Sequence, residues 1–358
     1  DFVRVRAHTT KPCCAEMVNG RGEVLRVIED NAYDAGVRVR ECDSCGVTMQ
    51  ILSPTPMMIP DFVDNANDAA AICAILNDDN ARLVAQFPTR FMALGAVPMA
   101  HPDHAVREME RIRRDHNMRG IEINSNVNGL DLDDPRFFPV FEAAAQMNMA
   151  VFIHPWGGFM SPSEPALKAR MNANRNWRPW LAGMPMETAL AFDSLCRGRV
   201  HERLPHLRVL YAHGAGVLPA ILGRMEHGSY CRPDLFASSS QMDPYETVRT
   251  CGVYADTLVH SPFAFAGLLG TMGAGRIALG SDYPYPLGEM ELPGTDGIYP
   301  GHMIEHLPGL DTDMKAAWPH FDWINPARLD GTHAELPRLD DAQCQRILSG
   351  TAREWLGV

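Results

Sequence analysis

Short apolar runs recur along the chain and alternate with longer amphipathic stretches. The runs lie at residues 47–53, 91–97, 120–123, 149–154, 209–213, 253–259 and 277–281. Continuous apolar runs of this length are typical of buried parallel strands. Helical patterns occupy residues 64–86, 103–115, 138–147 and 187–196 between them, and an amphipathic helix over 340–356, capped by Asp340 or Asp341, closes the chain.

Repeated strand–helix units imply a parallel sheet covered by helices. Seven such units predict a TIM-like (β/α)8 barrel of the α/β class with one strand unaccounted for. A doubly wound open sheet is the alternative. No G-x-G-x-x-G pattern follows an early strand, which weakens a dinucleotide-binding version of either fold.

The first 36 residues follow a different pattern. Residues 2–6 alternate apolar and basic side chains, and residues 15–28 read as strand, turn and strand around Asn19-Gly20. Asn-Gly is a strong hairpin signal, so we expect a small antiparallel flap over 1–36 and the barrel over 37–358. A second irregular stretch, 288–337, is too rich in aromatic residues for a linker, and we expect an ordered excursion that covers a pocket or an interface.

Polar side chains end three of the apolar runs. His154 follows 149–153, His213 follows 207–212, and Asp282 follows 277–281. Each has an ordinary explanation, a core histidine or a turn cap, but residues at the ends of barrel strands face the active-site mouth. Two imidazoles and a carboxylate suit Zn²⁺ with an open coordination position. The three together predict a metal hydrolase or lyase site.

Two arginines are candidate clamps for a substrate carboxylate. Arg38 precedes the first apolar run, and Arg224 lies eleven residues after His213. Guanidinium binds a carboxylate through two parallel hydrogen bonds, although solvated helix charges would look the same. His260 ends another run and is a weaker candidate. The remaining histidines of the second half of the chain lack ligand-like spacing and are interpreted as surface residues: His201, His206, His227, His302, His306, His320 and His333.

Composition narrows the classes of function. The 358 residues carry a formal net charge of −12, which argues against broad binding to nucleic-acid phosphates. No stretch approaches the ~20 apolar residues of a membrane span, and no signal-peptide pattern opens the chain. Nine cysteines, including the adjacent Cys13-Cys14 and Cys42-x-x-Cys45, fit reduced thiols in the cytoplasm better than a disulfide framework or a zinc knot.

These motifs in combination resemble the amidohydrolase superfamily, and most closely its aminocarboxymuconate semialdehyde decarboxylases. The similarity runs from about residue 2 to 291 and resumes over the last helix. The segments that carry it are 37–41, 91–99, 154–156, 180–188, 212–216, 223–224, 231–234 and 280–289.

The resemblance implies a role for each matching residue. His154 and Asp282 would be zinc ligands, and His213 would be the acid/base residue that takes a proton from zinc-bound water. Arg38 would bind a substrate carboxylate. Arg224 would reach the site of the neighbouring subunit, which makes the working unit a homodimer. Trp180 and Tyr285 would line the pocket.

Three departures from the family pattern matter. The family's first barrel strand carries a His-x-His pair that supplies two further ligands, and this chain has no such pair; His8 lies in the flap context and is no substitute. Because His154, His213, Asp282 and both arginines are present, we expect that the strand is missing from the chain rather than that the site has decayed. The residues after Trp156 differ from the family, and about 308–337 is an added stretch.

The resemblance therefore implies a zinc-dependent, non-oxidative decarboxylase of 2-amino-3-carboxymuconate 6-semialdehyde or a close relative, acting as a cytoplasmic enzyme on a small carboxylate. Two alternatives remain open. The same metal site could deaminate or hydrate an aminomuconate-type compound, and a metal-free paralogue could bind a ligand or partner without catalysis. Other divalent ions could also replace zinc.

Overall fold

Parallel strands form the centre of the molecule in the computed structural model, which describes residues 3–236, 239–289, 298–306 and 338–358. All seven apolar runs contain strands, and the run at 91–97 is divided into two short pieces. The strands are β4 (Gln50–Leu52), β5 (Phe91–Ala93), β6 (Gly95–Ala96), β7 (Gly120–Asn124), β8 (Ala150–His154), β9 (Val209–Tyr211), β10 (Val253–Asp256) and β11 (Ile277–Ala278).

The order of these strands in space follows their order in the sequence. β6 to β11 form one parallel sheet in the order β11-β10-β9-β8-β7-β6, and β4 pairs in parallel with β5. A doubly wound sheet would reverse direction at a switch point, so that alternative is wrong and the fold is a TIM-like α/β barrel. Within the described residues, no strand joins β4 to β11. A cavity of about 860 Å³ lies there, lined by Gln50 and Ile51 from one edge and by Leu279 and Gly280 from the other.

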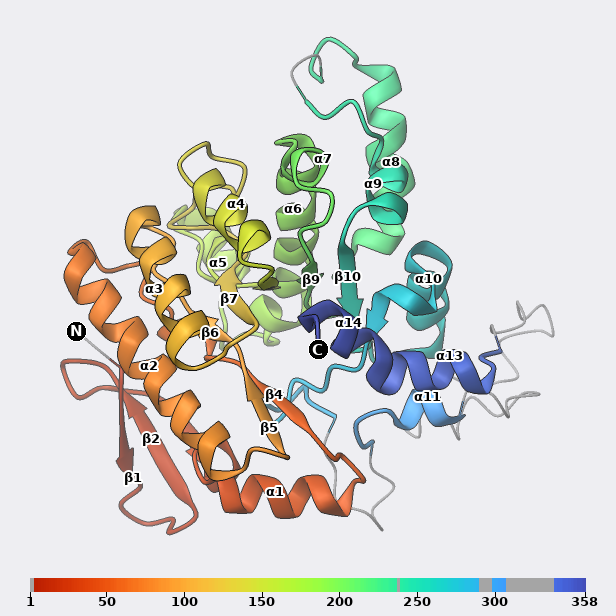
Figure 1. Ribbon diagram of the computed structural model, residues 1–358. Helices are drawn as coiled ribbons and strands as arrows, with labels where there is room; N and C mark the ends of the chain where they lie inside the picture. The colour runs from red at the N-terminus through yellow and green to blue at the C-terminus, as the bar shows by residue number, and fades with distance from the viewer. Residues whose placement is uncertain (1–2, 237–238, 290–297, 307–337) are drawn as a thin grey trace.

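Helices form the outer layer around the strands (Figure 1). The layer contains α2 (Ala66–Gln86), α3 (Pro102–Asp115), α4 (Phe138–Gln146), α6 (Met184–Arg197), α8 (Leu218–Cys231), α9 (Pro244–Thr250) and α10 (Pro262–Met272). Successive side chains of each strand point alternately into the ring of strands and outward toward the helices. The outward side chains, such as Ile121 and Ile123, are fully buried against helix residues such as Met109 and Ile112 and form the main core with them. Shorter helices lie in the connections: α1 (Ala35–Ser44), α5 (Pro165–Arg170), α7 (Val200–Arg203) and α11 (His302–His306).

Inward side chains build a second, smaller apolar cluster inside the ring of strands. Ala150, Leu210 and Tyr254 contribute to it from β8, β9 and β10, and Trp355 packs against them from the last helix. That helix comprises α13 (Asp341–Gln345), a π-helical turn (Arg346–Gly350) and α14 (Thr351–Leu356), and Asp340 caps it in a capping box, as predicted. The C-terminal helix thus closes the floor of the ring and leaves the opposite mouth, where the strands end, for a site.

The N-terminal region is a three-stranded antiparallel sheet, β1 (Arg4–Ala7), β2 (Cys14–Val18) and β3 (Val24–Glu29). The predicted turn is present, with the Asn19 side chain accepting hydrogen bonds from the backbone N–H groups of Arg21 and Glu23 at 2.9 and 3.0 Å. The flap is therefore confirmed, with one strand more than the hairpin alone required. It lies beside α1 and α2 at the left of Figure 1.

Two predictions about individual histidines are wrong. His201 and His302 are buried rather than on the surface, at 1% and 8% exposure. His201 fills the space between Phe192 and Tyr211, where Tyr211 Oη lies 2.8 Å from its Nε2. His302 stacks on His306 in α11. His320 and His333 lie outside the described residues.

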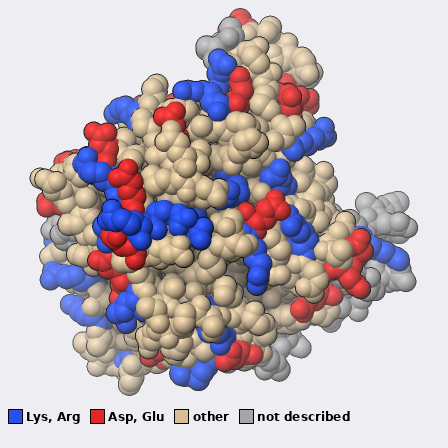
Figure 2. Space-filling view, in the orientation of Figure 1, with Lys and Arg blue, Asp and Glu red and all other residues tan. Residues whose placement is uncertain are grey.

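Figure 2 shows acidic and basic side chains interspersed over the visible face. None of the helices in the described parts of the chain has the length and apolar character of a membrane span. All nine cysteines are free thiols. The added stretch 308–337, and most of the excursion 288–337, lie outside the described residues.

Candidate active site

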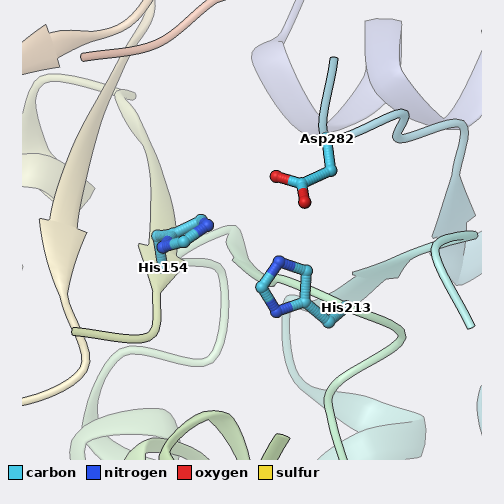
Figure 3. A group of neighbouring side chains, drawn as sticks. All are labelled: His154, His213 and Asp282. Carbon is cyan, nitrogen blue, oxygen red and sulfur yellow. The ribbon is translucent and has the colours of Figure 1, made fainter. Parts of the chain in front are cut away.

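His154, His213 and Asp282 meet at the mouth of the ring of strands (Figure 3). His154 is the last residue of β8, His213 follows β9 by two residues, and Asp282 follows β11 by four. One donor atom from each side chain lies within 4.8 Å of the others, and the two imidazole rings are 5.0 Å apart at an interplanar angle of 83°. The structure thus brings together the three residues that the sequence singled out.

A backbone cradle positions His213. Its φ is +58°, a conformation that side chains rarely adopt, and the next three residues also have positive φ values. Asp256, the last residue of β10, holds this turn by accepting hydrogen bonds from the backbone N–H groups of His213, Gly214 and Leu258 at 2.9, 2.8 and 3.0 Å. Strain of this kind persists only where the surroundings fix it, so Asp256 is a positioning residue.

The loop after His154 is held by a second buried acid. Glu187, in the first turn of α6, accepts hydrogen bonds from the Phe159 backbone N–H at 2.7 Å and from the Asn126 amide at 3.1 Å. The Asn126 amide also donates to the Trp156 carbonyl at 2.8 Å. Gly158 packs so closely against the Glu187 carboxylate, at a φ of +47°, that no Cβ fits there. The close approach of α6 therefore requires glycine at position 158, and Gly157, at a φ of +76°, packs instead against the Asn126 side chain.

Burial sets the protonation of the three residues. It lowers the pKa of His154 well below the usual range and lowers that of His213, which the charge of Asp282 partly offsets. It raises the pKa of Asp282, opposed by the charges of His213 and Arg26. The side chains are only half-buried by surface area because they face a cavity instead of bulk solvent. Both imidazoles are thus neutral near neutral pH, the form that binds a metal.

The donor set fits a divalent cation. Two neutral imidazoles and a carboxylate at this spacing match the ligands that zinc and related ions take. The cavity that contains these donors is lined by Asp282 and by two further acids, Glu122 and Asp256, and burial raises the pKa of all three. A bound cation would offset this concentration of buried acid. In the described residues this is the one cluster with the spacing of a metal site.

Two cavities meet at the site. One, of about 250 Å³, runs into the ring of strands and is lined by Glu122, His154 and Tyr285 among others. The other, of about 450 Å³, lies on the outer side of His213 and Asp282 and is lined mainly by apolar residues, with Trp180 and His260 among them. A substrate at the three-residue cluster can therefore extend into a polar chamber on one side and an apolar one on the other.

The remaining predicted residues differ in where they lie. Trp180 and Tyr285 each line one of the two cavities, and the Tyr285 hydroxyl is hydrogen-bonded to Thr55 at 2.7 Å. Arg38 lies in α1, lines the inner cavity and packs its guanidinium over the Tyr283 ring at 4.7 Å. Arg224 is exposed on α8 and lines neither cavity of this subunit.

Three residues at the site were not singled out from the sequence. Arg26, on β3 of the flap, stacks over the Tyr285 ring at 4.3 Å and lowers the pKa of Asp282. Asp256 is the last residue of β10, as His154 is of β8. The sequence did not show this, because the apolar run continues for three residues beyond the strand, to 259. Glu122 gave the plainest signal, a charged residue between two isoleucines in the middle of a strand that is buried throughout.

Comparison with known proteins gives one consistent result. The amidohydrolase family model matches residues 26–358. The 2-amino-3-carboxymuconate-6-semialdehyde decarboxylase of Dictyostelium discoideum is 40% identical over 295 residues, which cover 82% of this chain and 76% of that protein.

Solved structures agree on the fold. The apo form of Metarhizium anisopliae IDCase has a TM-score of 0.73 at 19% identity, covering 100% of this chain and 91% of its own. The 5-carboxyvanillate decarboxylase of Novosphingobium aromaticivorans, solved with manganese and 4-hydroxy-3-methoxy-5-nitrobenzoic acid, has a TM-score of 0.71 at 20% identity, covering 92% and 82%. The chain therefore belongs to the amidohydrolase family and groups with its decarboxylases.

Proposed function

We propose that this protein is a metal-dependent, non-oxidative decarboxylase of 2-amino-3-carboxymuconate 6-semialdehyde or a closely related unsaturated carboxylate. The observation that carries the proposal is the convergence of His154, His213 and Asp282 within 4.8 Å at the strand ends. The 40% identical relative bears that name. We further propose zinc as the metal, because it accepts imidazole and carboxylate ligands such as His154 and Asp282, and a homodimer as the working unit.

The reaction replaces a carbon–carboxylate bond by a carbon–hydrogen bond, so it consumes one proton and releases carbon dioxide. A divalent ion held by His154 and Asp282 would supply Lewis-acid polarisation of the substrate. His213 is placed to hold a proton on its imidazole and deliver it to the carbon that loses the carboxylate. Its depressed pKa leaves the resting ring neutral, so it first takes up a proton from water and then delivers that proton as the imidazolium, which is a strong acid at this site.

Three arginines are candidates for binding the carboxylates of the substrate. Arg26 stacks from the flap on Tyr285, a residue that lines the inner cavity, and Arg38 lines that cavity itself from α1. Guanidinium groups bind carboxylates through paired hydrogen bonds. We propose that Arg26 and Arg38 bind carboxylates of the substrate and that Arg224, exposed on α8, does so in the neighbouring subunit.

The test is a product assay with freshly generated aminocarboxymuconate semialdehyde, measuring carbon dioxide and ammonia together. The protein is loaded with zinc in one sample and manganese in another, and each is repeated after chelation. Chelator-sensitive release of carbon dioxide supports the proposal. Ammonia without carbon dioxide would show a deaminase, and neither product from metal-loaded protein would refute the substrate.

A His213→Ala variant tests the role of that residue. General acid/base catalysis typically contributes 10²–10⁴-fold, so we expect kcat to fall by roughly 10²-fold or more. His227→Ala, at an exposed position on α8, is the matched control and should retain full activity. Near wild-type turnover in His213→Ala would show that the role is wrongly assigned.

A further inference from the structure

Glu122 is the one charged side chain in the middle of β7, and it faces the inner cavity. Its neighbours Ile121 and Ile123 point outward into the helix-covered core, so alternation turns Glu122 inward. It is fully buried at 0% exposure and lines the chamber that also contains His154, His213 and Asp282. A charged residue at such a position requires a physical reason.

Neither oxygen of the Glu122 carboxyl group has a hydrogen-bond partner within the described part of the chain. The Ser53 side chain is the polar group that lowers the pKa of Glu122, but its geometry does not make a hydrogen bond with either carboxyl oxygen. Other buried acids at the site are satisfied: Asp256 accepts three backbone N–H groups and Glu187 accepts three donors. An unpaired buried carboxyl group costs folding free energy, which a ligand with a matching donor would recover.

Glu122 lies apart from the cluster of His154, His213 and Asp282. Its register partner on β8 is Phe152, and His154 lies two residues further along that strand. At ~3.3 Å per residue, Glu122 is one layer of side chains, about 7 Å, deeper in the ring than His154. The carboxylate is not part of the group whose donor atoms lie within 4.8 Å of one another. A substrate held at the mouth would therefore project its inner end toward Glu122.

The protonation of Glu122 suits recognition of a polar group. Burial and the nearby charge of Asp282 raise its pKa to about 8. A neutral carboxyl group both accepts and donates a hydrogen bond, and it does not repel a substrate that carries carboxylates. A site built to pair with a substrate N–H or O–H group rejects an analogue that lacks it, because its own polar group then stays unpaired.

We propose that Glu122 determines substrate specificity by accepting a hydrogen bond from an amino or hydroxyl group carried by the substrate inside the ring of strands. The substrate class is thus an unsaturated carboxylate bearing an N–H or O–H donor at its inner end. This inference rests on the proposed decarboxylase function and adds to it the group by which the substrate is read.

The experiment compares two substrates, aminocarboxymuconate semialdehyde and its analogue without the amino group, on four metal-loaded proteins. These are the wild type, Glu122→Leu, Glu122→Gln, and Glu142→Gln as a control at an exposed position on α4. Carbon dioxide release gives kcat and KM, and metal content and thermal unfolding are measured for each protein. Glu122→Gln keeps the size and the acceptor oxygen of the side chain, so it stays interpretable if Glu122→Leu does not fold.

We expect the wild type to prefer the amino substrate and Glu122→Leu to lose about tenfold of that preference, mainly through KM, at unchanged metal content. Glu122→Gln should retain most of the preference, and Glu142→Gln all of it. An equal loss for both substrates, an unchanged preference in Glu122→Leu, or a loss of bound metal would overturn the inference. Absence of carbon dioxide from the wild type with either substrate would instead refute the proposed function.

Discussion

The buried imidazole of His201 contributes to the pH dependence of the stability of this molecule. His201 is 1% exposed, and burial lowers its pKa from 6.5 to about 4. Below pH 6.5 the unfolded chain takes up a proton that the folded chain does not bind. The stability that His201 contributes is thus fully present above pH 6.5 and is lost as the pH falls toward 4.

We therefore expect the free energy of unfolding to fall, by on the order of 2–3 kcal/mol, between pH 6.5 and 4 through this residue. His201→Gln should flatten that part of the profile in urea unfolding measured at several pH values. His206→Gln, at an exposed position nearby, should leave the profile unchanged. An equally steep profile in His201→Gln would assign the dependence to other groups.

At the scale of elements, the sequence predicted where strands lie better than where they end. Every apolar run contains a strand because burial on both faces of a parallel sheet leaves an unmistakable pattern. The sequence predicts that β10 ends at residue 259, whereas the strand ends at Asp256. Thr257, Leu258 and Val259 continue the run of the sequence after the pairing with β9 has ended. That error hid Asp256, whose role depends on contacts with a turn distant in sequence.

The flap shows a second limit of the sequence. Its hairpin was predictable from local turn chemistry, but the docking of β3 over Tyr285 joins residues that are far apart in the chain. The sequence therefore favoured Arg38, which lines the inner cavity, and missed Arg26, which stacks on the lining residue Tyr285. Only the packing of the flap shows that Arg26, and not another arginine of the flap, acts on Asp282.

Replacing Arg26 tests whether the flap contributes to substrate binding. We expect Arg26→Ala to raise KM by roughly tenfold or more, since a charge-assisted hydrogen bond contributes about 1.5–3 kcal/mol. Arg4→Ala, exposed on β1 of the same sheet, is the matched control for general damage to the flap. A KM that does not change in Arg26→Ala would exclude the flap from recognition of the substrate, and steady-state kinetics on both variants gives the answer.

The turn after β8 makes a sharper prediction about packing. Gly158→Ala places a Cβ against the Glu187 carboxylate at a positive φ, so we expect a loss of about 1–3 kcal/mol in the free energy of unfolding. Gly228→Ala is the control, because nothing lies within 4 Å of its added Cβ in α8 and alanine favours helix. Denaturant unfolding should show opposite signs for the two variants. Equal stability of Gly158→Ala and the wild type would contradict the tight packing of this loop.

At the scale of the whole molecule, one end of the ring of strands stabilises the fold and the other end carries the candidate site. Its floor is closed by apolar side chains and the C-terminal helix, and its mouth collects acids and imidazoles from several strands. This division follows from parallel strands, whose carboxyl ends all meet at one edge. The sequence predicted the cluster of His154, His213 and Asp282 for the same reason. The proposed dimer has no comparable local pattern and rests on family resemblance alone.

The dimer can be tested by mixing inactive variants. Arg224 is exposed on α8 and lines no cavity of its own subunit, so its proposed role requires the neighbouring site. Arg224→Ala and His213→Ala should each be nearly inactive alone. In a heterodimer of the two, the Arg224→Ala subunit keeps His213 and receives the intact arginine from its partner, which restores one of two sites.

After unfolding and refolding an equimolar mixture, half of the dimers are mixed, so activity should recover to about a quarter of wild type. No recovery, in a mixture that light scattering shows to be dimeric, would place Arg224 outside the neighbouring site, and a monomer would exclude the shared site altogether.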